Sequence, residues 1–365
     1  MQRPCESVVR CDGSSRPLPR GEAVRLPPMD TALAIDIGGT KLAAGVVRGN
    51  GSVLSWLSIP SGIADGPAAV IARQIELGRR AVEVASVSWE RIGAVGIACG
   101  GPLDPFEGVI QSPPNLPGWD DVPLVSIVQE ALDRPTVVEN DATAGALAEF
   151  WYGAGRSREI RDLVYFTIST GVGGGLVLDG RLHRGAAGNA GELGHLTVYY
   201  LGRQCGCGRR GCLEAYASGT SIAARAREAL ATGEPSSLAA LESPTARDVA
   251  EAALAGDRLA MRIWDETTAI LASAMANVLD IFNPELIVLG GGVTRAGDQL
   301  LRPVREAGLA QAMGPARRSA DIVLSELGDQ LGVVSAAAVA FERLGDRLAG
   351  PLAQAVPAGV SNARR

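Results

Sequence analysis

Five residues at the end of the first apolar segment combine an acid, two glycines, a hydroxyl and an ammonium group. They are Asp36, Gly38, Gly39, Thr40 and Lys41, and Lys41 is the only lysine among the 34 basic residues of the chain. Glycines at the end of a strand let backbone N–H groups approach an anion, while a carboxylate can hold Mg²⁺ directly or through water. The spacing differs from that of a Walker loop. We therefore predict a phosphate-binding turn, with an ordinary hairpin turn as the alternative.

A second glycine-rich run occupies residues 170–175, where four of the five residues from 171 onward are glycine. Each glycine costs about 0.5–1 kcal/mol in a regular element, so a plain bend explains the run poorly. A loop that approaches a ligand explains it better, and we predict a glycine turn over this range. Its members are Thr170, Gly171, Val172, Gly173, Gly174 and Gly175.

Two acidic residues lie where substrate hydroxyls could be bound or deprotonated. Asp141 opens a helix predicted at 142–150 and closely follows a strand predicted at 136–139. An aspartate there commonly caps the helix, but ligand crevices of α/β folds open at the carboxyl ends of strands, where a carboxylate can accept a proton from a hydroxyl. Glu192 is flanked by small residues and lies three residues before His195. We predict that its carboxylate binds sugar hydroxyls, with a solvated surface residue as the alternative.

Three cysteines and a histidine form the strongest local signal in the sequence: His195, Cys205, Cys207 and Cys212. Three thiolates and one imidazole make a complete tetrahedral set for structural Zn²⁺, with no position left for a catalytic water. No apolar secretory segment begins the sequence, and clustered cysteines in a cytoplasmic chain favour a metal site over disulfides. Three buried free thiols are the alternative, which the polar, glycine-rich segment 202–211 disfavours.

These groups are carried by two similar halves, each of which begins with a strand, a glycine turn and a second strand. In the first half we predict strands at 31–37 and 42–47, and in the second half strands at 163–169 and 176–178. Apolar spacing also predicts a long helix at 68–84. A duplicated unit of this kind indicates two α/β domains that face each other across a cleft. The remaining predicted elements are strands at 53–59, 92–98 and 286–289, helical segments from 220 to about 282, and a last helix at about 333–344.

Composition excludes several classes of protein. The chain has 365 residues, of which 47% are hydrophobic, enough for a sizeable core in two or three domains. The net charge of −6 without a basic stripe argues against nucleic-acid binding, and no apolar run of about 18 residues indicates a membrane span. Residues 1–28 are rich in Pro, Arg, Ser and Gly and are predicted to be disordered. Translation from Met29 is the explanation that we favour for them.

Taken in order, these motifs resemble those of the ROK family of sugar kinases and repressors, which belongs with hexokinase to the actin-like ATPase superfamily. The resemblance runs from about Met29 to about Leu344. It implies an α/β fold of two ribonuclease-H-like domains around a central cleft. The implied divisions are a disordered extension at 1–28, an N-terminal domain at 29–140 joined by the C-terminal helix 333–345, a C-terminal domain at 141–332 with a zinc loop at 195–214, and a flexible tail at 346–365.

The resemblance also implies a role for each motif. The turns at 36–41 and 170–175 would bind the phosphates of ATP, and Asp141 would be the catalytic base that takes the proton from the 6-hydroxyl of the sugar. His195 would serve twice, with one ring nitrogen on zinc and the other toward a sugar hydroxyl. The implied adenosine-side loop is Gly290, Gly291 and Gly292, and the implied sugar contacts are Asn115, Asn140, Asp141, Glu192, His195 and Glu214.

The implied activity is ATP-dependent phosphorylation of a hexose at the 6-hydroxyl, with Mg²⁺ as cofactor. The glucokinases of the family are the most similar group, so glucose to glucose 6-phosphate is the expected reaction. An N-acetylhexosamine kinase, for example for N-acetylmannosamine, is one alternative. A sugar-responsive transcriptional regulator is another, although 28 residues before Met29 are too few for its winged helix-turn-helix. We expect a cytoplasmic homodimer or homotetramer that binds a hexose and ATP but no nucleic acid or membrane, and polyphosphate in place of ATP stays open.

Overall fold

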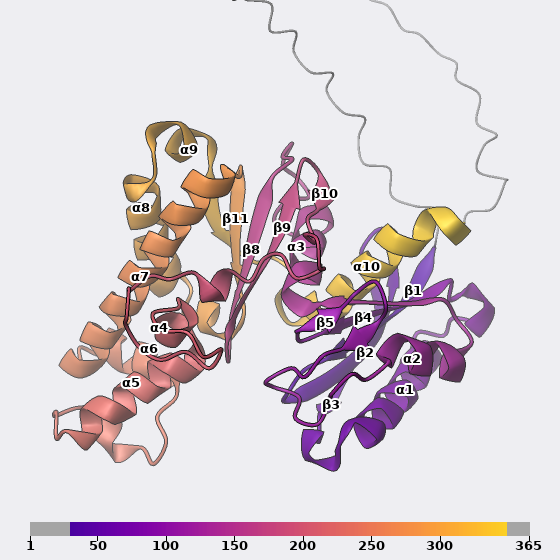
Figure 1. The fold of residues 1–365 in the computed structure, drawn as a ribbon, viewed down its shortest axis with the longest axis horizontal. Helices are drawn as coiled ribbons and strands as arrows, with labels where there is room; N and C mark the ends of the chain where they lie inside the picture. The colour runs from indigo at the N-terminus through magenta and orange to yellow at the C-terminus, as the bar shows by residue number, and fades with distance from the viewer. Residues whose placement is uncertain (1–29, 349–365) are drawn as a thin grey trace, which may run out of the picture.

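The computed structural model describes residues 30–348, which form two α/β halves, each built on a five-stranded sheet (Figure 1). The strand orders are β3-β2-β1-β4-β7 and β10-β9-β8-β11-β12, so the two sheets have the same topology. In each sheet the first three strands in the chain are antiparallel and the last two are added in parallel. The strands are β1 (Thr31–Ile37), β2 (Lys41–Arg48), β3 (Val53–Pro60), β4 (Ala94–Cys99), β7 (Thr136–Asn140), β8 (Leu163–Ile168), β9 (Val172–Leu178), β10 (Arg181–Leu182), β11 (Leu286–Gly290) and β12 (Asp321–Leu324), with a separate hairpin of β5 (Leu103–Asp104) and β6 (Val109–Ile110).

Two helices, α3 and α10, lie between the two sheets (Figure 1). α10 packs on β1 and β4 of the first sheet, α3 packs on β8 and β9 of the second, and the two helices also contact each other. The outer face of the first sheet is covered by α1 and α2, and that of the second by α7 and its neighbours. The helices are α1 (Pro67–Val84), α2 (Leu124–Leu132), α3 (Asp141–Trp151), α4 (Glu214–Ala217), α5 (Gly219–Ala231), α6 (Ala246–Leu254), α7 (Arg258–Phe282), α8 (Asp298–Gln311), α9 (Gly314–Ser319) and α10 (Leu331–Leu348).

The side chains of β1 explain why the two faces of the first sheet carry different helices. Successive strand residues point to opposite faces, so Leu33 and Ile35 pack with α1 while Ala32 and Ala34 pack with α10. The small residues let the backbone of α10 come very close to the sheet. A Cβ on Gly96 of β4 would lie 1.8 Å from the carbonyl oxygen of Ala336 in α10. The alanine-rich last helix is therefore fitted to the narrow space between the sheets.

The structure corrects the predicted glycine turn at 170–175. Only the hydrogen bond from Ser169 N–H to the Gly171 carbonyl closes a turn there, and β9 already begins at Val172. A Cβ on Gly175 would lie 2.6 Å from the carbonyl oxygen of Ala142 at the start of α3. The glycines of this strand are thus explained by close packing of a helix onto β9, which the sequence interpretation did not consider.

The ends of the described chain bear on two further predictions. Residues 1–29 and 349–365 lie outside the described part, so the prediction of disorder at 1–28 and most of the predicted tail at 346–365 fall there. The last helix is longer than predicted, since α10 continues to Leu348. The proposed domain limits at 140 and 332 stay predictions. Within residues 30–348, no helix has both the length and the hydropathy needed to cross a membrane.

Candidate functional site

The carboxyl ends of three parallel strands meet at one edge of the first sheet. Ile37 of β1 pairs with Cys99 of β4, and Cys99 pairs with Asn140 of β7. This register brings Asp36 and Asp141, which lie far apart in the sequence, to the same edge. It is also the edge where ligand crevices open in α/β folds.

The charge of Asp141 affects the ionisation of Asp36. Burial raises the pKa of Asp36 to about 7, with a further increase from the Asp141 charge and a decrease from Lys41. Burial likewise raises the pKa of Asp141, and hydrogen bonds from the backbone oppose the increase. Asp141 is exposed to solvent, whereas Asp36 is half-buried. The edge therefore holds two carboxylates that a ligand can reach.

The first turn of α3 fixes the orientation of Asp141. The side-chain Oδ1 of Asn140 accepts hydrogen bonds from the N–H groups of Ala142 (3.0 Å) and Thr143 (3.1 Å), so Asn140 is the helix cap. Asp141 Oδ1 also accepts from the Ala142 N–H, at 2.8 Å. A cavity of about 40 Å³ lies directly beside these residues. It is lined by Asn140, Asp141, Thr143, Gly173, Gly174, Asn189, Ala190, Gly191 and Glu192.

The first predicted phosphate turn is a tight β-hairpin connection. The Gly38 N–H donates to the Lys41 carbonyl at 3.1 Å, while Thr40 and Lys41 are exposed. A Cβ on Gly39 would lie 3.0 Å from the carbonyl oxygen of Asn115. The segment around Asn115 therefore lies against this turn, as a shared site for both would require.

A larger cavity, of about 830 Å³, lies on the second half. Thr170 and Gly292 of the predicted phosphate and adenosine loops line it. Gly291 has a φ of 94°, and a Cβ there would lie 2.5 Å from the carbonyl oxygen of Ile168, so this position requires glycine. The sequence interpretation missed the rest of the lining, which includes Gly219, Thr220, Ala223, Arg227, Ser243, Pro244, Thr245, Ala246, Arg247, Asp248 and Glu251.

One sequence signal could have located part of that missed wall. Thr245 and Asp248 form a capping box at the start of α6, in which each side chain accepts a hydrogen bond from the other residue's backbone N–H. The pattern of a threonine followed three residues later by an acid predicts a helix start. Pro244 directly precedes it. The residues at this helix start and in the loop before it line the cavity.

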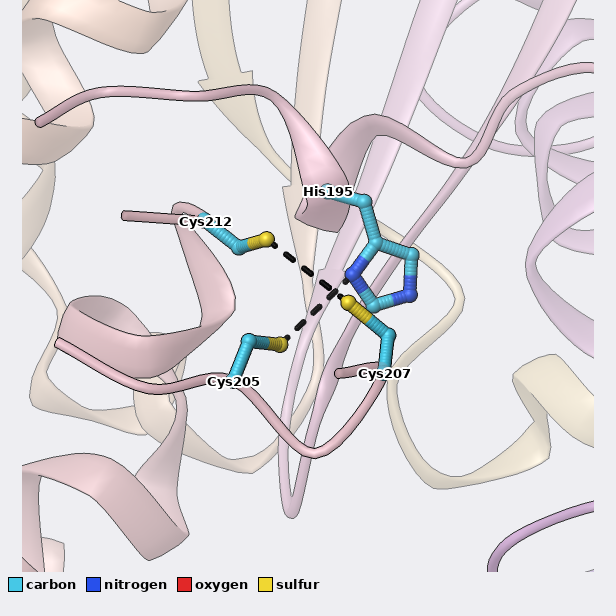
Figure 2. Close-up of side chains that lie close together, drawn as sticks. All are labelled: His195, Cys205, Cys207 and Cys212. Carbon is cyan, nitrogen blue, oxygen red and sulfur yellow. Dashed lines mark hydrogen bonds between the residues drawn. The ribbon is translucent and has the colours of Figure 1, made fainter. Parts of the chain in front are cut away.

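The predicted zinc ligands are brought together as a tetrahedral set (Figure 2). One donor atom from each of His195, Cys205, Cys207 and Cys212 lies within 4.8 Å of all the others. Cys205 Sγ is 3.8 Å from His195 Nδ1, and Cys207 Sγ is 3.8 Å from Cys212 Sγ. A tetrahedral ion with bonds of about 2.3 Å to sulfur separates its ligands by about 3.8 Å. The donor set and its spacing therefore fit Zn²⁺.

Glycines give the metal loop its shape. Gly208 has a φ of 86°, and its N–H donates to the Cys205 carbonyl, which closes a turn around Cys207. Gly211 has a φ of 80°, and a Cβ there would lie 1.6 Å from the carbonyl oxygen of Tyr199. Both positions need the left-handed backbone and the absent side chain of glycine.

The cluster of His195 and the three cysteines contacts the rest of the site through two glutamates. His195 turns Nε2 toward Glu192, whose Oε2 lies 3.8 Å away. Glu214 Oε2 accepts a hydrogen bond from the Val172 N–H at 2.9 Å, and its Oε1 lies 3.6 Å from Cys205 Sγ. Of the predicted sugar contacts, Glu192 thus lines the small cavity, whereas the Glu214 carboxylate contacts the start of β9.

The pKa of Glu192 is shifted by its burial and by the charged residues around it. Burial raises its pKa, the charge of His195 lowers it, and the charges of Asp141 and Glu214 raise it further. Three other predicted site residues therefore lie close enough to act on the Glu192 carboxylate. The structure brings them together from three separate segments of the chain.

Comparison with known proteins places this geometry in a family. The sequence profile of the ROK family matches residues 32–343. The chain belongs to the ROK family. A glucokinase from Thermotoga maritima is 36% identical to this chain over 317 residues, which cover 86% of this chain and 98% of that protein. This ROK-family chain therefore matches such relatives over almost their whole length.

Solved structures of ROK proteins have the same fold. A ROK hexokinase from Thermus thermophilus superposes with a TM-score of 0.72 at 36% identity, covering 87% of this chain and 99% of that one. A ROK family glucokinase from Streptomyces griseus, solved in complex with glucose and AMPPNP, gives a TM-score of 0.71 at 32% identity and covers 85% of this chain and 98% of that one. The predicted α/β fold of two related halves is confirmed.

Proposed function

We propose that this ROK-family chain is an ATP-dependent hexose kinase, with glucose as the preferred acceptor. The observation that carries the proposal is the small polar cavity lined by both Asp141 and Glu192, with the glycine turn at residues 36–41 at the same edge of the sheet as Asp141. The relatives point the same way, since a similar structure was solved with glucose and an ATP analogue.

Asp141 has the properties that a general base for this reaction needs. Its carboxylate would accept the proton of the sugar 6-hydroxyl while that oxygen attacks the γ-phosphorus, and the bond from the γ-phosphorus to the bridging oxygen would break to release ADP. A pKa raised by burial makes Asp141 a better proton acceptor than an ordinary carboxylate. The hydrogen bond from Ala142 keeps the group fixed at the helix start.

Neighbouring side chains would hold the sugar against this base. Glu192 and Asn189 line the same cavity and can hydrogen-bond hydroxyl groups. His195 would fix the position of Glu192 through Nε2, because its other nitrogen faces the cysteine cluster. Zn²⁺ held by the cluster would order this wall of the site and supply no catalytic water.

The larger cavity would hold the nucleotide. Its volume of about 830 Å³ suits a nucleotide, and Arg227 and Arg247 on its lining add positive charge for an anionic ligand. Thr170 lies where this cavity meets the second turn, and the N–H groups of the first turn would complete the phosphate site. Asp36 would hold Mg²⁺, which neutralises charge on the transferring phosphoryl group when bound.

A sugar panel tests the proposal. Purified chain is assayed for ADP release with MgATP and glucose, mannose, fructose, allose, N-acetylglucosamine or N-acetylmannosamine, and polyphosphate is tried as a second donor. We expect the highest kcat/KM with glucose. A preference for an N-acetyl sugar would select the alternative kinase, and sugar binding without ADP release from any acceptor would refute the kinase.

A further inference from the structure

A half-buried arginine joins three parts of the chain beside the small cavity. Arg184 Nε donates to Glu139 Oε2 at 2.6 Å, while Nη2 and Nη1 donate to the two carboxylate oxygens of Glu342 at 2.7 and 3.0 Å. The Glu139 side chain is 0% exposed and that of Arg184 is 15% exposed. A planar guanidinium makes these bonds from three nitrogens held in a fixed plane, whereas a lysine ammonium has its three donors on a single atom.

The three residues come from three elements that converge at this point. Glu139 lies in β7, directly before Asn140 and Asp141, and its Oε1 accepts the Asn140 N–H at 3.1 Å. Glu342 belongs to α10, the helix between the sheets. Arg184 follows β10 of the second sheet. The network therefore ties the strand that leads into the base to the central helix and to the other half.

Arg184 also forms the base of the loop that carries Glu192. Its carbonyl accepts the Ala190 N–H at 3.0 Å, which folds residues 184–190 back on themselves. Gly191 then rests on β9, since a Cβ there would lie 2.7 Å from the Gly174 carbonyl oxygen. The backbone of Arg184 thus holds the loop that leads to Glu192. The side chain of Arg184 holds Glu139 near the end of β7.

We propose that Arg184 is a positioning residue that holds the base Asp141 and the sugar-binding loop 184–192 in one geometry. The inference rests on the proposed function for its kinetic part only. Arg184 lines neither cavity and would act through Glu139 and through its own loop. The nucleotide cavity is lined by other segments and does not include this network.

The kinetic test compares Arg184→Lys with Arg181→Lys, an exposed arginine of the same hairpin. Lysine keeps the positive charge beside the buried Glu139 and so protects the fold, but it lacks the rigid planar set of donors that bonds both carboxylates here. Displacement of reacting groups by about 1 Å costs up to about 10²-fold in rate. We expect Arg184→Lys to lower kcat/KM for glucose by about tenfold or more, with the KM for ATP within twofold of wild type. Arg181→Lys should match wild type.

Hydrogen exchange tests the anchoring without any substrate. In Arg184→Lys we expect faster exchange in the peptide covering 184–192, with β11 unchanged and the zinc content equal to that of wild type. Unchanged exchange in this peptide would overturn the inference even if the chain proves not to be a kinase. Equal loss of ATP and glucose affinity, or wild-type glucose kinetics, would overturn it while leaving the proposed function intact.

Discussion

Replacing Asp36 should make the protein more stable at neutral pH while removing its activity. Burial and the neighbouring Asp141 charge raise the pKa of Asp36 from 3.8 to about 7. A folded state that prefers the protonated acid is penalised when the acid ionises. Asparagine has the same shape and carries no charge, so Asp36→Asn should remove that penalty.

The size and the pH range of the effect follow from the pKa values. A pKa raised from 3.8 to about 7 corresponds to about 4 kcal/mol between the folded and unfolded states. Because Asp36 is only partly buried, water screens part of this cost, and we expect a gain of about 2–3 kcal/mol for Asp36→Asn at pH 8. The stability that the protonated acid gives is present in full below about pH 3.8, falls as the pH rises, and is gone above about pH 7. The stability gain of Asp36→Asn should therefore be absent below about pH 3.8, grow as the pH rises, and be complete above about pH 7.

The assay is thermal unfolding of wild type and Asp36→Asn between pH 4.5 and 8, without nucleotide or magnesium. The variant should melt several degrees higher at pH 8, and the difference should shrink toward pH 4.5. Glu76→Gln removes a charge at an exposed position of α1 and should leave the melting temperature unchanged. A variant that is no more stable than wild type at pH 8 would refute the reasoning. A variant whose gain in melting temperature is the same at pH 4.5 and at pH 8 would also refute it.

Four further substitutions probe separate parts of the site. Asp141→Asn should lower kcat by about 10²–10⁴-fold while sugar binding persists in calorimetry; a wild-type kcat would leave Asp141 as a structural residue. Cys207→Ala should lose the one zinc expected per chain and raise the KM for sugar far more than that for ATP, as elemental analysis and kinetics would show; fully active protein without zinc would contradict this. Lys41→Arg should raise the KM for ATP and leave sugar affinity unchanged, because a planar guanidinium fits the tight turn less well than a compact ammonium; equal kinetics would place the ammonium in solvent. Gly175→Ala places a Cβ 2.6 Å from the Ala142 carbonyl oxygen, so it should cost about 1–3 kcal/mol in urea unfolding and lower kcat by moving Asp141; a neutral substitution would show that α3 is free to shift.

Local patterns in the sequence predicted those parts of the site that are themselves local. The four predicted metal ligands lie within 18 residues, and their types alone predict a tetrahedral set. The turn at Gly38 and Gly39 follows from glycine at the end of an apolar strand. The strand end and helix start that the sequence predicts around Asp141 are present, while the role of Asp141 as base stays a prediction.

The parts that escaped prediction depend on packing between distant segments. The glycines of β9 were interpreted as a ligand loop, although Gly175 is needed because α3 lies against it. The contact of Arg184 with Glu342 spans 158 residues of sequence and leaves no periodic signal. The long wall of the larger cavity belongs in part to α5 and α6, whose exposed residues resemble any solvated surface. Chain topology, rather than composition or spacing, creates all three features.

The most direct test of the central proposal is the product itself. Wild-type chain and Asp141→Asn are incubated with glucose and MgATP, and phosphorus NMR follows the sugar and nucleotide signals. The account predicts one glucose 6-phosphate for each ADP with wild type and almost none with the variant. The same product at the same rate from Asp141→Asn, or no sugar phosphate from wild type with any hexose, would contradict it.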